Sequence, residues 1–351
     1  MNSLPALKNV VLSSCLTMRV LSLKNLVRIL INSLIGLILI LIWLKLVNLQ
    51  EVLDKISQVN LLFTIPFIIL FALSFNLRAI RLKILLSSEQ SIPLSNIVYL
   101  TSLSQLLSFL IPLRLGELAK AVYLGAEYKI KFSKALIWIL LDRFIDFWTV
   151  LIISLVLLIF LPTNLPENLK LSLSFLIVLS SLGGIFLIFF PKYSKKLAEI
   201  FALLLVFKPV KSLFLKVSFH IIDTASFLNR GLVGSIKLIL ITILVLISDA
   251  LAWWVLFVIV FKTQAGLLPV LLGSLLNTLT YLIPAAPGYI GSAEAAGLAV
   301  FHFGLGFDKT LVSAITVLNH ALTVFCVLFY GLISLYLLKF DLSLVWKKLK
   351  R

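Results

Sequence analysis

Long apolar segments alternate with short basic segments along this chain. Runs such as 34–43 and 150–161 contain no charged residue, and they belong to segments long enough to cross a bilayer as helices. The strands of a membrane β-barrel would instead alternate polar and apolar residues. The pattern therefore predicts helical membrane spans, and we place them at residues 29–47, 61–77, 135–161, 171–190, 236–261 and 310–338.

Two further apolar segments, 95–111 and 267–303, are interrupted by the same short pattern. Residues 105–117 read QLLSFLIPLRLGE and residues 277–288 read NTLTYLIPAAPG. In both, an aromatic residue precedes Leu-Ile-Pro, and a glycine follows four positions after the proline. A proline breaks a helix, and hydrocarbon cannot solvate the backbone groups that are freed. Two such breaks at corresponding places in two halves indicate a transport-type site within the membrane.

Composition supports an all-α polytopic membrane protein with about six to eight transmembrane helices. Of 351 residues, 61% are hydrophobic and 13% are charged, and the mean hydropathy is +1.16. The formal net charge is +17, but the basic residues lie beside the membrane segments. This placement is typical of a topological signal and of contact with anionic lipid, so no nucleic-acid partner is expected.

The distribution of basic residues predicts the orientation. Of the 31 Lys and Arg residues, 25 lie in four segments, which we assign to the cytoplasm because cytoplasmic loops hold the excess: 1–28, 78–134, 192–237 and 339–351. Both termini are then cytoplasmic. The corresponding domains are a basic arm (1–28), a transmembrane domain (29–338) with a cytoplasmic or interfacial connector (191–235), and a basic tail (339–351).

This orientation places both ends of 95–112 on the cytoplasmic side and both ends of 267–303 on the other side. We therefore expect two re-entrant hairpins in an inverted repeat, with 61–161 set against 236–338. The alternative is that 267–303 makes two short full crossings joined by a turn at Pro287 and Gly288.

Charged side chains near the first break are candidates for lipid binding, because ionisable groups at membrane depth are costly unless paired or hydrated. Arg114, Glu117 and Lys120 are spaced by three residues, so they share one face of a helix. They form either an ion-paired structural knot or a site for an anionic head group, in which the arginine fork binds phosphate. Arg78 and Arg81, at the end of the second span, are included in this site.

The next span carries Asp142, Arg143 and Asp146. One interpretation is a structural salt bridge, within the helix or to Arg114 or Arg78. The other is that these residues position the basic groups of the head-group site, and both can hold together.

Two further ionisable residues lie in the later spans. Asp249 has no basic residue within one helical turn, which favours a neutral, hydrogen-bonded acid or a role in proton coupling. His320 is either a packed hydrogen-bonding residue or part of a proton relay. In the second hairpin we select Pro284, Pro287, Gly288, Gly291 and Glu294, where Glu294 either caps the returning helix or faces the cavity.

Enzyme signatures do not occur in the sequence. It contains no GxSxG, Walker loop, HExxH, paired CxxC or glycine-rich dinucleotide turn, and we predict no cofactor, no metal site and no catalytic residue.

Three motifs together resemble the lysylphosphatidylglycerol synthase transmembrane-region family, also called flippase-like. They span about residues 25–340 and comprise Gln105, Pro112, Arg114, Gly116, Glu117 and Lys120, then Asp142, Arg143 and Asp146, then Pro284, Pro287, Gly288, Gly291 and Glu294. The resemblance implies a bacterial or archaeal inner-membrane protein that moves lipids between leaflets. Related proteins carry a soluble aminoacyl transferase that these 351 residues do not include, so synthase activity is not expected. Lys120 and His320 stand where the family would have arginine.

The sequence thus predicts a membrane lipid translocase whose partner is a membrane lipid with an anionic or lipid-linked head group. In this hypothesis Arg114 and Lys120 receive the head group, Glu117, Asp142 and Asp146 hold the cations, and Pro112 and Pro284 keep the backbone open. The alternative is a non-transporting subunit that scaffolds an envelope-lipid glycosyltransferase or synthase, with that enzyme as partner. A third interpretation, a membrane-embedded transferase, would use Asp142 or Glu294 as its acid.

Overall fold

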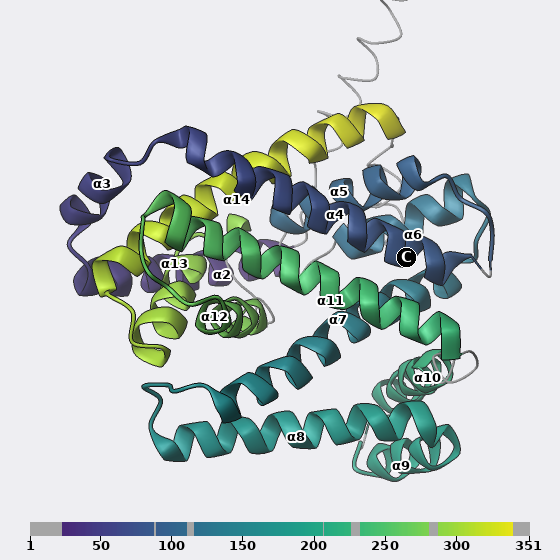
Figure 1. The fold of residues 1–351 in the computed structure, drawn as a ribbon. Coiled ribbons are helices and arrows are strands. Elements are labelled where there is room, and N and C mark those ends of the chain that lie inside the picture. Colours follow the sequence, from purple (N-terminus) through teal and green to yellow (C-terminus); the bar gives the residue numbers. More distant parts are fainter. Residues whose placement is uncertain are drawn as a thin grey trace, which may run out of the picture.

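The computed structural model describes residues 23–87, 89–110, 116–205, 207–225, 232–280 and 287–339. Every regular element in these ranges is a helix, and none is a strand (Figure 1). The prediction of an all-α polytopic membrane protein is confirmed.

Five helices in the described ranges are long and apolar enough to cross a membrane. They are α4 (Ile65–Leu86) with its leading turn η1 (Leu61–Thr64), α7 (Phe132–Phe160), α8 (Glu167–Phe189), α11 (Leu232–Trp254) with the π-helical extension η4 (Val255–Val260), and α14 (Lys309–Leu338). A sixth span is obtained if α2 (Leu23–Leu46) and α3 (Leu49–Ser57) are counted together. The segments that the hydropathy pattern predicts as spans agree with these helices to within a few residues at most ends.

The short helix α3 was not predicted from the sequence. Its apolar residues Leu49, Val52, Leu53 and Ile56 share one face, and Val52 is fully buried. Asn48 caps the helix by accepting a hydrogen bond from the backbone N–H of Gln50. The chain bends by 85° between the end of α2 and α3, so the apolar run of α2 does not continue straight.

The two interrupted segments each form a short helix before the break. Helix α5 (Leu94–Leu110) has 17 residues and α12 (Leu267–Thr280) has 14. At ~1.5 Å per residue they are roughly 26 Å and 21 Å long, which is less than the ~30 Å hydrocarbon core. Pro112 and Pro284 lie outside the described residues. After the breaks the chain forms α6 (Gly116–Glu127) in the first half, and η5 (Pro287–Tyr289), α13 (Ser292–Gly297) and η6 (Leu298–Gly304) in the second.

The helix contacts repeat between the two halves of the chain. Helix α4 packs along α11, its counterpart in the other half (Figure 1). The contact of α5 with α14 has its counterpart in that of α12 with α7, and the contact of α6 with α7 has its counterpart in that of α13 with α14. The units α4–α7 and α11–α14 therefore pack as two related sets around the α4–α11 pair.

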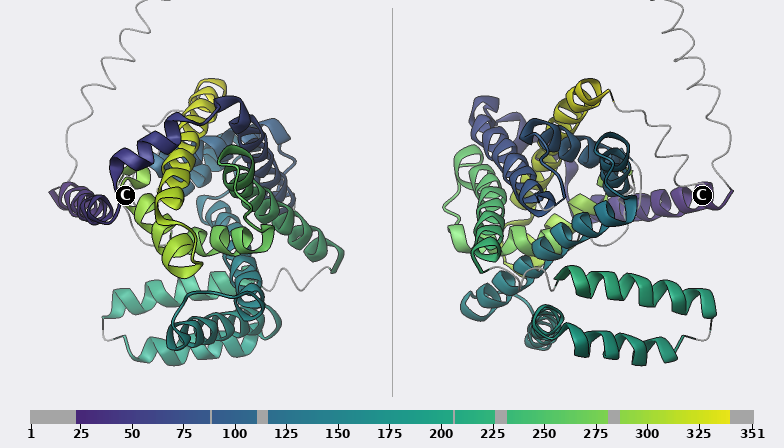
Figure 2. Two further views of the ribbon diagram at one scale, coloured as in Figure 1. Left: turned by 60° about the vertical axis from the view of Figure 1, so that its left-hand side comes forward. Right: turned by 90° about the vertical axis from the view of Figure 1, so that its right-hand side faces the viewer.

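The connector between the halves forms two helices, α9 (Pro191–Leu203) and α10 (Lys208–Ala225). They pack against each other and beside α7 and α8 (Figure 2). Neither of them is among the candidate membrane spans.

Candidate functional site

A cavity of about 620 Å³ is lined mainly by residues of α4, α5, α6, α7, α11, α12 and α14, with single residues from α10, η5 and α13. Several lining residues are aromatic, and three of them, Phe67, Phe71 and Phe75 of α4, are spaced by four residues and so share a helix face. Arg78 lies on the same face, one turn further along, and also lines the cavity. The spacing of these phenylalanines is visible in the sequence, but the predicted site did not include them.

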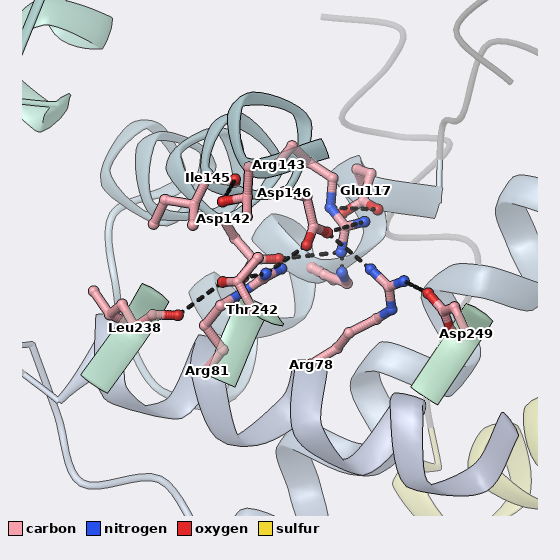
Figure 3. A network of polar contacts seen from close by, with 12 residues as sticks. Arg78, Arg81, Glu117, Asp142, Arg143, Ile145, Asp146, Leu238, Thr242 and Asp249 are labelled. Carbon is pink, nitrogen blue, oxygen red and sulfur yellow. Dashed lines mark hydrogen bonds and ion pairs between the residues drawn. The ribbon is translucent and has the colours of Figure 1, made fainter. Parts of the chain in front are cut away.

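Eight charged side chains form one connected network next to this cavity (Figure 3). They come from four helices, and they are Arg78 and Arg81 of α4, Glu117 and Lys120 of α6, Asp142, Arg143 and Asp146 of α7, and Asp249 of α11. The first repeat thus supplies seven of the eight, and Asp249 joins the second repeat to them.

Arg81 is the buried centre of the network. Its Nε donates to Asp142 Oδ1 at 2.7 Å, and its Nη1 donates to Asp146 Oδ1 at 2.5 Å and to Thr242 Oγ1 at 3.0 Å. The side chain is 0% exposed and does not line the cavity. The sequence placed Arg81 among the predicted head-group contacts, whereas the structure gives it a supporting position behind the cavity wall.

Arg78 bridges two helices across the cavity wall. Its Nη1 donates to Asp146 Oδ2 at 2.8 Å, and its Nη2 donates to Asp249 Oδ2 at 2.6 Å. The sequence has no basic residue within one helical turn of Asp249, and in the structure its basic partner comes from another helix, 171 positions away in the chain.

Lys120 and Arg143 share Glu117. Lys120 Nζ lies 2.9 Å from Glu117 Oε2, and Arg143 Nε lies 3.6 Å from Glu117 Oε1. Arg143 also contacts Asp142 at 3.1 Å and Asp146 at 3.4 Å. Burial lowers the pKa of Lys120, and the Glu117 carboxylate opposes that shift.

Glu117, Lys120 and Arg143 all line the cavity. Arg114 lies outside the described residues, so its predicted place in this group has no structural description.

His320 of α14 contacts two residues of the second hairpin, Glu294 and Gly288. Its Nδ1 lies 2.5 Å from Glu294 Oε1, and its Nε2 lies 2.8 Å from the Gly288 carbonyl oxygen. Glu294 Oε2 accepts a hydrogen bond from the Gly291 backbone N–H at 2.8 Å, which forms the helix cap that was one of the two alternatives for this residue. The carboxylate therefore both caps α13 and contacts His320, whose side chain lines the cavity.

Gly291 allows this hairpin to pack against α2. Its φ is +80°, in the left-handed region, and a Cβ there would overlap the carbonyl oxygen of Gly36 in α2. Gly116 has a similar role in the first half, because a Cβ on it would overlap the Ser104 carbonyl oxygen and Ser108 of α5. Both glycines are therefore places where two backbones approach closely.

The family described as lysylphosphatidylglycerol synthase TM region matches residues 27–331. The chain belongs to this family. The match covers the first repeat, the second repeat as far as residue 331, the charged network and the His320–Glu294 contact. No curated protein and no solved structure matches the chain significantly. The match confirms the resemblance to this family that the three sequence motifs indicate.

The two halves of this family member use a related pairing. In each, an acid that follows the break contacts a basic residue of the long helix that comes next: Glu117 with Arg143, and Glu294 with His320. The first pair is part of the eight-residue network. The second pair contacts the backbone at Gly288 and Gly291, before α13. The resemblance predicts arginine at position 320. His320 instead contacts Glu294 and the Gly288 carbonyl oxygen, and it lines the cavity.

Proposed function

We propose that this protein is an integral membrane lipid translocase, which moves a lipid head group between the two leaflets of a bacterial or archaeal cell membrane. The observation that carries the proposal is one cavity that combines aromatic with charged side chains, in a protein with five helices in its described part that are long and apolar enough to cross a membrane. A phospholipid has the same two parts, and hydrocarbon alone cannot accommodate the polar part. We assign the chain no catalytic step.

In this proposal the phosphate of the head group contacts the cations on the cavity surface, which are Arg78, Lys120 and Arg143. Arginine offers a planar fork that matches two phosphate oxygens, and the neighbouring carboxylates hold that fork in place. Arg114 would add a further cation from the break. Asp142 and Arg81, which lie behind the wall, would support the site without touching the lipid.

The acyl chains would lie along the phenylalanine face of α4, where Phe67, Phe71 and Phe75 line the cavity. The helices α5 and α12 are too short to cross the hydrocarbon core, which favours re-entrant hairpins. In this proposal, such hairpins let the head group pass without contact with hydrocarbon. The termini would be cytoplasmic, in keeping with the basic segments. Because Asp249 is paired with Arg78, we propose an ion-pairing role for it and not proton coupling.

A reconstituted transport assay tests the proposal. Full-length protein in liposomes that contain a fluorescent phospholipid should make the inner-leaflet label accessible to a membrane-impermeant quencher. Arg143→Gln should lower the initial rate by at least about tenfold, which corresponds to the loss of one charge-assisted contact worth about 1.4 kcal/mol.

Lys134→Gln is the matched control, because Lys134 is 57% exposed, its side chain pairs with Glu89, and neither residue lines the cavity. Equal rates in liposomes with and without wild-type protein would overturn the proposed function. Unchanged rates in correctly folded Arg143→Gln protein would overturn the assignment of the site.

A further inference from the structure

We propose that the cavity binds a hydroxyl-rich head group, a polyol or a sugar, and that uncharged side chains of α5 and α12 recognise its hydroxyl groups. This inference rests on the proposed function and names its substrate class. The recognising residues are Thr101, Gln105 and Ser108 on α5 and Asn277 on α12, all of which line the cavity.

The charges of the network balance, so the network has little net charge with which to select one head group over another. Among the described residues it contains four cations and four carboxylates, and each cation contacts at least one carboxylate. A bound phosphate would therefore compete with carboxylates that already hold the cations. Discrimination between phospholipids then depends on the groups that are not yet satisfied.

Besides the ion-paired charged groups, the cavity wall carries uncharged groups that lack a hydrogen bond. Within the described part of the chain, Thr101 Oγ1, Ser108 Oγ and Asn277 Oδ1 are buried and have no hydrogen-bond partner. Asn277 is 3% exposed and Thr101 is 5% exposed. A buried polar atom without a partner is costly, so its occurrence on a cavity wall indicates that a ligand or water completes it. Amide and hydroxyl groups together both donate to and accept from ligand hydroxyls.

The repeat brings these groups together from both halves. Gln105 and Asn277 occupy the same position of the repeated pattern, seven residues before the proline, and each places an amide on the cavity. Ser108 follows Gln105 by three residues and lies on the same helix face. A hydroxyl-bearing ligand would thus meet one amide from each half of the protein.

An aromatic surface borders the same wall. The ring centroids of Phe109 and Tyr289 are 6.1 Å apart, and both residues line the cavity. Sugar and polyol head groups present C–H groups as well as hydroxyls, so an apolar ring beside hydrogen-bonding amides matches both parts. The volume, about 620 Å³, lies within the usual range of roughly 300–1,000 Å³ for small-ligand pockets.

Binding measurements on detergent-purified full-length protein test this inference. The probes are two pairs of dioleoyl lipids, each differing by hydroxyl-bearing groups: phosphatidylinositol against phosphatidic acid, and glucosyl-diacylglycerol against diacylglycerol. Native mass spectrometry gives the affinity ratio within each pair. We expect the hydroxyl-rich member of each pair to bind at least about fivefold more tightly, since one net hydrogen bond contributes about that factor.

Asn277→Leu and Ser108→Ala should each lower both ratios towards one while leaving phosphatidic acid binding unchanged. Ser154→Ala is the matched control, because Ser154 Oγ is also buried without a partner but lies outside the cavity lining. It should leave both ratios unchanged. Ratios near one in the wild-type protein, or an equal loss of phosphatidic acid and phosphatidylinositol binding in Asn277→Leu, would overturn the inference.

These outcomes are separate from a failure of the transport proposal. Absence of translocation in liposomes, with the binding ratios preserved, would contradict transport but retain the hydroxyl-binding site. Translocation that depends on Arg143 but shows no hydroxyl preference would retain transport and remove this site.

Discussion

Arg78 and Asp249 lie 171 positions apart in the chain, and their Nη2 and Oδ2 atoms are 2.6 Å apart in the structure. The other Nη atom of Arg78 contacts Asp146 of α7 at 2.8 Å. One guanidinium group thus joins α4 and α7 of the first repeat to α11 of the second. Because Arg78 also lines the cavity, the group that links the repeats belongs to the proposed lipid path.

The first prediction concerns the geometry of this link. Arg78→Lys keeps the charge, but one ammonium group does not reproduce the planar fork that contacts both carboxylates. We expect a loss of about 1–2 kcal/mol in unfolding free energy, of the order of one hydrogen bond to a charged group. Thermal unfolding in detergent measures it, with Lys134→Arg as a surface control that should not change. Equal melting temperatures for Arg78→Lys and wild type would show that the fork contributes nothing.

The second prediction concerns the buried cation. Arg81→Met removes the 0% exposed partner of Asp142, which is itself 1% exposed and keeps its contact with the partly exposed Arg143. Removal of one member of a buried ion pair costs about 3–5 kcal/mol. Lys134→Met breaks the pair between the exposed Lys134 side chain and Glu89, and should cost no more than about 1 kcal/mol. Denaturant unfolding of the two variants provides the comparison, and similar losses would contradict a central structural role for Arg81.

The third prediction concerns the second hairpin. His320→Leu removes the contacts with Glu294 Oε1 and with the Gly288 carbonyl oxygen. Hydrogen exchange of residues 287–297 should become faster, while exchange of α5 stays unchanged. His302→Leu is the control, because His302 contacts the Phe307 carbonyl oxygen and lies outside the cavity lining. Unaltered exchange at 287–297 in His320→Leu would mean that the hairpin is held by other contacts.

The fourth prediction concerns the approach of the hairpin to α2. Gly291→Ala places a Cβ at a φ of +80° and against the Gly36 carbonyl oxygen, so we expect destabilisation of at least about 1 kcal/mol. Gly183→Ala is the paired control, since a Cβ there meets nothing within 4 Å and Gly183 lies inside helix α8. It should be neutral or stabilising by up to about 1 kcal/mol. The same thermal scan measures both variants, and a reversed order would contradict the close packing of α2 and α13.

The long helices could be predicted because continuous apolar runs define them. Helix α7 begins three residues before the predicted span 135–161, and α14 begins one residue before the predicted span 310–338. Helix α3 escaped prediction because it is short and half polar, and only its Asn48 cap and the spacing of its apolar residues mark it.

The partners of the charged residues depend on tertiary packing. The spacing of Glu117 and Lys120 predicts a shared face, and the two side chains are in contact. The partner of Asp249 comes from a distant helix, so neighbouring sequence does not reveal it. Similarly, the two alternatives for Glu294 arise from its local sequence, but only the packing of α14 brings His320 to its carboxylate.

Photocrosslinking tests most directly whether a lipid head group occupies the cavity. Full-length protein in liposomes is irradiated with a phospholipid that carries a diazirine on its head group, and the labelled peptides are identified by mass spectrometry. We expect labelling of cavity residues such as Gln105 and Phe109, and reduced labelling there in Arg143→Gln protein. Labelling confined to outward residues such as Phe175 and Leu179 of α8, with none in the cavity, would contradict a lipid site in the cavity.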